Sequence, residues 1–230
     1  SYYHAFSLGD EAAEYGIARV LIQPRRLWAL LRNGMVVDAS FSHTDVWPDE
    51  APTLDVHVIP PLCTSKPHLC AWAPNHQQLL LCTDTGAWAL EQEHSYASLP
   101  FTQPILGASY SLQGKYVAWL DEHQQLHVDT ADFSRQLRTY DLRTSQAYQA
   151  APMALRAGPL LDDDSLFGQK LDKGGLGGSG VYAMAWCKDN AVALAMYEHI
   201  LLLGPYEEPL VFHVRGIPHI YSSPDGLHVV

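Results

Sequence analysis

The residues best suited by type to hold a metal ion are Cys63, His68, Cys70 and Cys82. Zinc sites are usually marked by ligand pairs two to four residues apart, repeated once along the chain, and this set shows no such repeat. Cys70 and Cys82 instead fall in two neighbouring apolar runs, where a thiol behaves as a small core side chain. We therefore expect packed thiols and no metal site.

Two loop motifs also resemble ligand sites. Gly175, Gly177 and Gly180 match the spacing of a dinucleotide-binding fingerprint, which requires a strand before the glycines and a helix after them. Here a charged loop precedes the glycines and a β-type run, 181–186, follows them. Asp162–Asp164 has the charge of a calcium loop but lacks the alternating ligands and the terminal Glu. We expect neither motif to bind a cofactor or a metal.

The sequence contains no recognisable pattern of catalytic residues. It contains no Gly-x-Ser-x-Gly elbow, and no Ser/His/Asp set can be assembled from residue order. A hydrolase would need acidic side chains that converge, whereas we expect a separate surface turn for each of Asp84, Asp121, Glu122 and Asp189. The aromatic residues expected to pack in the core are Trp28, Trp72, Trp88, Trp119 and Trp186. The chain is predicted not to be an enzyme, with no catalytic, cofactor-binding or metal residue.

The composition is that of one folded domain with more acidic than basic residues. The chain has 230 residues, 47% of them hydrophobic, which is enough for a substantial core. A net charge of −11 argues against nucleic acid and against electrostatic docking on an anionic membrane. No run of eighteen apolar residues and no signal peptide is visible. The four cysteines stand singly, which fits buried thiols in a reducing cytosol.

The last fifty residues contain the clearest repeat of the chain. Short β-favouring runs alternate there with turns such as Cys187–Asn190, and runs of this kind form antiparallel strands. Four strands in about forty residues make one blade of a β-propeller. The four runs are 181–186, 191–196, 199–203 and 210–214. The runs 217–221 and 227–230, separated by a turn at 222–226, begin another blade.

Two similar units are found upstream, and each opens with an apolar run that ends in an aromatic residue. Their runs are 68–72, 79–82 and 87–90, then 105–110, 116–120 and 126–128, with 135–143 as an outer strand. The aromatic residues of all the units are Trp72, Tyr110, Trp186 and Tyr221. The gap between Tyr110 and Trp186 is about twice one blade, so it holds either a skipped blade or a long insertion.

Residues 144–180 favour the insertion. They lose all hydrophobic periodicity and contain Asp162–Asp164 and the glycine-rich segment 174–180. Such a segment buries too little apolar surface to offset chain entropy. We predict a mobile, low-complexity insertion that limited proteolysis should cut first.

The pattern of the first sixty residues predicts a degenerate blade. We expect a strand tail at 1–8, a helical turn at 9–15, and strands at 17–22, 27–31, 35–39 and 54–59. Asn33 and Gly34 supply the positive φ angles of a tight hairpin turn. The predicted fold class is therefore all-β, a partial WD40-like β-propeller of about four to five degenerate blades that spans residues 1–230.

Three C-terminal segments resemble one family. They are Met184–Asn190 with its Trp-Cys turn, Leu202–Tyr206 with its Gly-Pro step, and Pro224–Val230 with its Asp-Gly step. At this spacing the chain is similar to the N-terminal domain of the vacuolar protein sorting-associated protein 16 family, subunits of the class C tethering complexes HOPS and CORVET. Phe6–Glu11 resembles the family's Phe-Ser-Met-Gly-Asn-Glu segment, and Lys115–Trp119 resembles the strand before its outer hairpin. The sequence departs from the family at His228, where a basic residue is common, and in its long 144–180 insertion.

The resemblance implies a non-catalytic scaffold in endosome-to-vacuole or lysosome trafficking, membrane tethering and fusion. It implies a cytoplasmic protein, peripheral on late endosome and vacuole or lysosome membranes through its complex. The implied partners are other class C subunits and, indirectly, SNAREs and Rab GTPases. The Sec1/Munc18-type subunit would bind through the family's C-terminal α-solenoid, which this sequence does not contain.

Two alternatives stay open. The same blades suit a scaffold of another vesicle coat or of the nuclear pore, which co-purifying partners would distinguish. A propeller hydrolase is the other alternative, and it would need charged residues converging at the inner ends of the strands.

Overall fold

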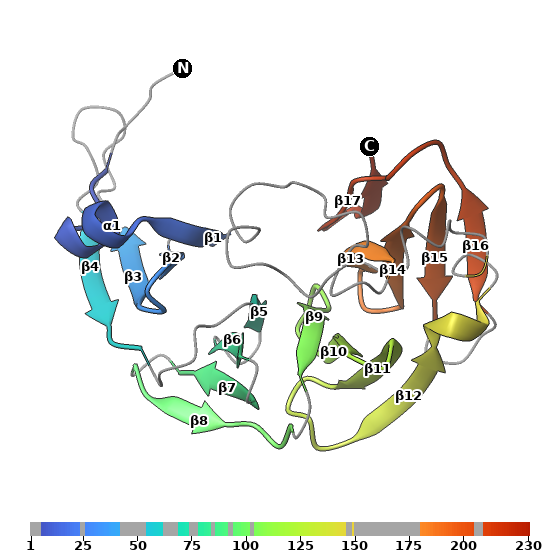
Figure 1. Ribbon diagram of the computed structural model, residues 1–230, viewed down its shortest axis with the longest axis horizontal. Helices are drawn as coiled ribbons and strands as arrows, with labels where there is room; N and C mark the ends of the chain where they lie inside the picture. The colour runs from blue at the N-terminus through green and yellow to red at the C-terminus, as the bar shows by residue number, and fades with distance from the viewer. Residues whose placement is uncertain are drawn as a thin grey trace. The chain divides into compact units, whose positions relative to one another are not determined.

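The computed structural model describes residues 6–23, 26–41, 54–61, 69–73, 78–83, 86–91, 94–101, 104–145, 149, 180–204 and 209–230. Within these ranges the chain forms eighteen strands, one short α-helix and one 3-10 helix (Figure 1). It divides into two compact units, residues 1–67 and 68–230, each of which is described by itself. The prediction of an all-β fold is confirmed.

The first unit is one antiparallel sheet with a helix beside it. Its elements are α1 (Asp10–Tyr15), β1 (Ile17–Gln23), β2 (Arg26–Leu31), β3 (Val36–Phe41) and β4 (Leu54–Ile59), and the strands pair in that order. Ala29, Leu31 and Val37 form the core of the unit. Leu8 and Ala12 pack against that core, so α1 and the segment before it cover apolar surface of the sheet.

Two details of this unit differ from the sequence prediction. Residues 6–8 of the predicted strand tail 1–8 form no strand, and the ring of Phe6 instead meets that of Phe41 edge to face at 5.3 Å. In the β2–β3 turn only Gly34 has a positive φ, of 88°. The Asn33 side chain accepts a hydrogen bond from the backbone N–H of Met35. Asn33 therefore stabilises the turn through its side chain and not through a left-handed backbone.

The second unit contains three four-stranded sheets and one hairpin. The first sheet contains β5 (Leu69–Ala73), β6 (Gln78–Thr83), β7 (Gly86–Leu90) and β8 (Tyr96–Ser98). The second contains β9 (Ile105–Tyr110), β10 (Tyr116–Asp121), β11 (Gln125–Thr130) and β12 (Gln136–Asp141). The third contains β13 (Val181–Cys187), β14 (Ala191–Met196), β15 (His199–Leu203) and β16 (Leu210–His213). The hairpin is β17 (Ile220–Ser223) with β18 (Gly226–Val229). The first strand of each sheet lies against the first strand of the next, while β8, β12 and β16 lie along the outer rim (Figure 1).

The inner strands are apolar because both of their faces are covered. In β14 five consecutive residues from Val192 are buried, whereas β16 on the rim has no buried residue. One core cluster lies between the β9–β12 and β13–β16 sheets and includes Leu120, Leu126 and Leu194. A second cluster, with Leu80 and Ile105, joins the β5–β8 and β9–β12 sheets. Sheets that bury both faces against their neighbours are the blades of a propeller.

Most predicted strands are found within one or two residues of their expected ends, but two assignments need correction. β8 was not predicted, because Tyr96–Ser98 is only three residues long and carries no apolar run. The predicted strand 217–221 begins later, at Ile220. Almost all of the predicted insertion 144–180 lies outside the described residues, apart from Thr144 at the end of a 3-10 helix, Ser145, Gln149 and Gly180.

The register of the hairpin also corrects the predicted series of aromatic residues. Tyr110 and Trp186 each lie opposite the second residue of the following strand, Val117 and Val192 respectively. In the hairpin the residue opposite the second position of β18 is Ser222, and Tyr221 is one place out of register. A shift of one residue moves a side chain to the other face of a sheet, so the position equivalent to Trp186 holds a serine.

Candidate functional site

The cysteine and glycine motifs show no sign of a ligand site where the structure describes them. Cys82 is a buried thiol on β6, and Cys70 lies on the neighbouring strand β5, as predicted. Gly180 is followed by β13 and not by a helix. Cys63, His68, Gly175, Gly177 and Asp162–Asp164 lie outside the described residues.

The described part of the chain contains no group of three or more His, Cys, Asp or Glu side chains placed to hold a metal ion. His123 and His127 have the His-x-x-x-His spacing that suits a metal on a helix. They lie instead in the β10–β11 turn and on β11, so the spacing does not bring them to one face. None of the described helices is long and apolar enough to cross a membrane.

The acidic residues considered for a hydrolase have separate surroundings, and one of them was placed wrongly. Asp121 was expected in a surface turn, but it ends β10 and is only 1% exposed. Glu122 is exposed in the following turn, as expected. Asp189 lies in the β13–β14 turn and contacts the preceding blade. Asp84 is outside the described residues.

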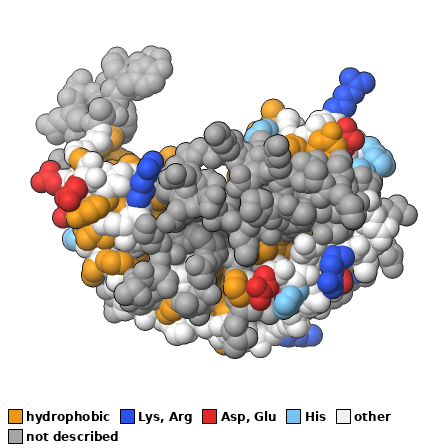
Figure 2. Space-filling model, viewed as in Figure 1, with side chains coloured by type: hydrophobic (Ala, Val, Ile, Leu, Met, Phe, Trp, Pro, Cys, Tyr) orange, Lys and Arg blue, Asp and Glu red, His pale blue; other side chains and the backbone are white. Residues whose placement is uncertain are grey.

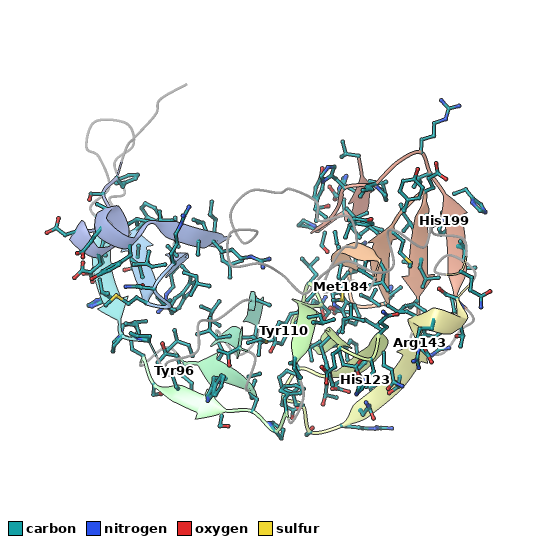
Figure 3. The ribbon with its side chains drawn as sticks, viewed as in Figure 1. Tyr96, Tyr110, His123, Arg143, Met184 and His199 are labelled. Atoms are coloured by element: carbon teal, nitrogen blue, oxygen red, sulfur yellow. The ribbon has the colours of Figure 1, made fainter. Side chains whose placement is uncertain are left out.

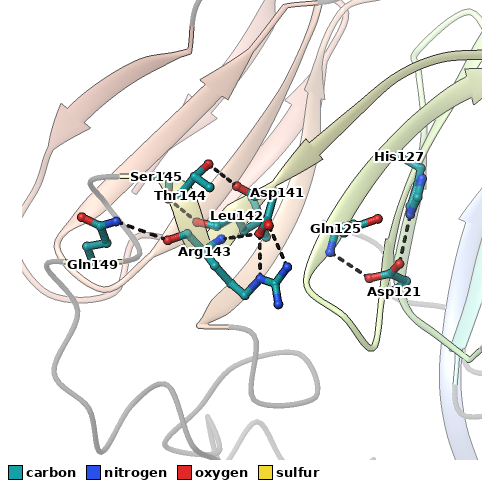
Figure 4. Close-up of polar contacts among 9 residues, drawn as sticks. All are labelled: Asp121, Gln125, His127, Asp141, Leu142, Arg143, Thr144, Ser145 and Gln149. Atoms are coloured by element: carbon teal, nitrogen blue, oxygen red, sulfur yellow. Dashed lines mark hydrogen bonds and ion pairs between the residues drawn. The ribbon is translucent and has the colours of Figure 1, made fainter.

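Asp121 is buried because it belongs to a polar network on one face of the β9–β12 sheet. Its Oδ1 accepts the backbone N–H of Gln125 at 2.8 Å, and its Oδ2 lies 3.1 Å from Nε2 of His127 (Figure 4). Nδ1 of His127 lies 2.8 Å from the amide nitrogen of Gln136 and 3.3 Å from the Thr139 hydroxyl. An amide nitrogen can only donate, so His127 carries its proton on Nε2 and donates it to Asp121.

The network continues from His127 to an indole. The His127 ring stacks on Trp119 with centroids 3.9 Å apart, and Nε1 of Trp119 donates to Oδ2 of Asp129 at 2.6 Å. Phe101 then covers Trp119 edge to face from the segment after β8. Acid, imidazole and hydroxyl are thus brought together, with Asp121 and His127 buried and Thr139 exposed on β12. The arrangement orients strands β10, β11 and β12.

Asp129 is the carboxylate at the far end of this network, hydrogen-bonded to Trp119. Burial raises the pKa of Asp129, and the hydrogen bond from Trp119 and the nearby His127 oppose that rise. Its Oδ1 is buried without a hydrogen-bond partner in the described part of the chain. A buried carboxylate with a hydrogen bond to only one of its oxygens is destabilising, and it is not placed to act as a catalytic base in contact with solvent.

Trp186 forms the inner part of the junction between the third and fourth blades, the β9–β12 and β13–β16 sheets. Its side chain is 2% exposed, and its Nε1 donates to the backbone oxygen of Ser109 on β9 at 2.8 Å. Tyr116 on β10 stacks beside its ring. The prediction that Trp186 packs between blades is confirmed.

Two further contacts complete the same junction. Asp189 accepts the backbone N–H of Gln113 at 3.0 Å, and its other oxygen lies 3.7 Å from the ammonium group of Lys115. At the rim, Nη1 of Arg138 donates to the backbone oxygen of Gly204 at 2.8 Å. Trp186, Asp189 and Gly204 all belong to the segments that carry the family resemblance, so those segments hold blades together.

The hairpin is attached through Ser222. The Ser222 hydroxyl donates to the backbone oxygen of Trp186 at 2.6 Å and accepts its backbone N–H at 2.9 Å. Gly226 begins β18 with a φ of 146°. Ser222 thus holds, in the hairpin, the register position that Trp186 holds in β13. Its two hydrogen bonds to the neighbouring strand take the place of an aromatic contact.

Exposed apolar side chains are found on the outer strand of the fourth blade. Leu210 and Phe212 on β16 are 54% and 51% exposed, and they point to the same side of the strand because they are two residues apart. On the face that Figure 2 shows, the visible Lys and Arg side chains lie apart from one another. Leu210 and Phe212 offer an apolar surface of the kind that protein contacts use.

No family model and no curated protein matches this chain. Solved structures do resemble it. The C-terminal WD40 domain of Sif2 matches with 13% identity and a TM-score of 0.50, over 91% of this chain and 55% of that one. Hsv2 of Kluyvelomyces marxianus matches with 10% identity over 85% and 57% of the two chains, at a TM-score of 0.47.

A chain in the crystal structure of the mitotic checkpoint complex matches with 9% identity, over 70% of this chain and 44% of that one, at a TM-score of 0.44. The present chain spans about half the length of these chains. At such low identity the match to Sif2 shows the fold alone. Together with the four four-stranded sheets and the separate hairpin, it shows that this chain has the fold of a partial WD40-like β-propeller.

Proposed function

We propose that this chain is a non-catalytic interaction module of a class C vacuolar tethering complex of the HOPS and CORVET type. The observation that supports the proposal most is the placement of the segments resembling the vacuolar protein sorting-associated protein 16 family. Trp186, Asp189 and Gly204 all lie at one blade junction, and each makes a hydrogen bond or ion pair across it. Residues that define such a junction shape a propeller and the surfaces it presents.

The chemistry of the described residues supports an interaction role over a reaction. A cluster of acid, imidazole and hydroxyl groups surrounds the buried His127, and its hydrogen bonds join neighbouring strands. Two of the three exposed side chains on β16, Leu210 and Phe212, are apolar instead. In this proposal Leu210 and Phe212 contact another subunit of the complex, and the protein reaches endosomal and vacuolar membranes only through that complex.

The proposal is tested by changing the rim without changing the core. Leu210→Asp with Phe212→Asp, made in the full-length subunit, should reduce co-purification of the other class C subunits by at least about tenfold, since a charge in an apolar contact costs more than 1.4 kcal/mol. Arg215→Asp is the matched control, because Arg215 is also exposed and lies near β16. Recovery of coat or nuclear pore proteins, with no class C subunit, would contradict the proposal.

A further inference from the structure

Two histidines that are distant in the sequence face each other on the rim of the fourth blade. His199 opens β15 and His213 closes β16, and they are register partners in the antiparallel ladder. Their ring centroids lie 4.6 Å apart with 60° between the ring planes. Figure 3 shows His199 among the strands of this blade. A directly opposed pair of imidazoles on neighbouring strands is a two-ligand arrangement that sequence spacing does not reveal.

The hydrogen bonding of His199 fixes which of its nitrogens is free. Nδ1 lies 2.8 Å from the backbone oxygen of Tyr197. A carbonyl oxygen can only accept, so Nδ1 carries the proton and Nε2 of the neutral ring holds a lone pair. This bond from one ring nitrogen to a carbonyl is the arrangement that orients histidine ligands in metal sites.

The backbone holds the two rings in register. The N–H of Glu198 donates to the oxygen of Gly216 at 2.7 Å, and the N–H of Val214 donates to the oxygen of Glu198 at 3.0 Å. These bonds tie the turn before β15 to the segment after β16, next to both histidines. His199 is 8% exposed and therefore held in place, while His213 is exposed and gives an ion access from solvent.

The geometry points to a divalent transition-metal site, and we propose that His199 and His213 bind one Zn²⁺ ion or a similar ion. Two Zn–N bonds of about 2.0–2.1 Å at a tetrahedral angle place two ring centroids about 5 Å apart, close to the 4.6 Å separation found. Imidazole selects Zn²⁺, Cu²⁺ or Ni²⁺ over Ca²⁺ and Mg²⁺, which prefer oxygen ligands. The chain's net charge of −11 also favours a cation. Water completes the coordination, so binding is weaker than at a four-ligand structural site.

The proposal is tested by titrating the chain with zinc chloride in an isothermal titration calorimeter at pH 7.5. The wild type and His123→Ala, which removes an exposed histidine elsewhere, should bind one Zn²⁺ at least tenfold more tightly than His213→Ala. His213 is exposed, so its replacement should leave the fold intact, which circular dichroism checks.

A second readout assigns the ligands directly. Substoichiometric Zn²⁺ should shift the imidazole NMR signals of His199 and His213 before those of any other histidine, with the Nε2 resonance of His199 affected most. Equal affinities for the wild type and His213→Ala would overturn the proposal. It would also be overturned if the first signals to shift belonged to other histidines.

Discussion

At the scale of single residues, Gln124 has a backbone conformation that suits glycine. It lies in the β10–β11 turn with a φ of 63°, and its side-chain oxygen is buried without a partner in the described part of the chain. A left-handed conformation costs a non-glycine residue about 1 kcal/mol. Gln124→Gly should therefore raise the free energy of unfolding by about that amount, measured by urea denaturation. Gln124→Ala keeps the unfavourable φ, and an equal gain from that variant would show that the backbone is not the cause.

Asp129 should make stability depend on pH. Burial raises the pKa of its carboxyl in the folded protein, so the folded state holds this proton more tightly than the unfolded state does. The resulting stability is fully present below the unfolded pKa of about 3.9 and is lost as the pH rises through the folded pKa.

Asp129→Asn removes this titration. The wild type should lose stability relative to the variant as the pH rises from 3.5 to 7, in urea unfolding curves measured at matched ionic strength. Parallel pH profiles for the two proteins would mean that Asp129 titrates normally.

Residue-level roles were the part that the sequence predicted least well. Asp121 follows an apolar run and precedes Glu122, which is typical of a surface turn, yet it is buried because His127 lies across the ladder. His199 and His213 belong to two different runs of the sequence, 199–203 and 210–214, and only the β15–β16 register makes them neighbours. Contacts across a sheet depend on register, which residue order does not state.

At the scale of elements, Trp186 should carry much of the junction between the third and fourth blades. Trp186→Ala should lower the free energy of unfolding by roughly 3–5 kcal/mol, as the loss of a large buried aromatic side chain does. Trp186→Phe keeps apolar volume but leaves the oxygen of Ser109 without its donor, so its cost should be smaller, about 1–3 kcal/mol. Chemical denaturation measures both, and a loss below 1 kcal/mol for the alanine variant would contradict the packing described here.

The attachment of the β17–β18 hairpin should depend on one hydroxyl. Ser222→Ala removes two hydrogen bonds to the backbone of Trp186 and should speed amide exchange in residues 220–229 by about tenfold, with little effect on β10. Ser223→Ala is the matched control, because the Ser223 hydroxyl bonds only to Gly226, Asp225 and His228 within the hairpin in the contacts described. Equal exchange in both variants would show that Ser222 does not attach the hairpin.

The strands themselves were largely predictable, for a physical reason. Blades bury both faces, so inner strands such as 191–196 and 116–120 are continuous apolar runs with turns between them. The prediction failed where burial is weak, at Tyr96–Ser98, and where polar contacts decide the strand, at Ser222. Pro218 lies within the predicted strand 217–221 and cannot donate to a ladder, which is consistent with a strand that begins at Ile220.

At the scale of the whole molecule, the central claim is that this propeller region is an interaction module of a class C tethering complex. The fold is that of a partial WD40-like propeller, a scaffold that serves many functions, so the fold alone does not choose among complexes. The choice rests on the residues that resemble the family, and only partners recovered from cells can test it.

The most direct measurement compares the full-length subunit with a form from which residues 1–230 are deleted. Each form is purified from cells, and the class C subunits recovered with it are quantified by mass spectrometry. We expect the Sec1/Munc18-type subunit to stay bound through the α-solenoid that the family resemblance implies, while the other subunits of the larger complex fall at least severalfold. Unchanged recovery of every subunit, together with unchanged vacuole fusion, would contradict it.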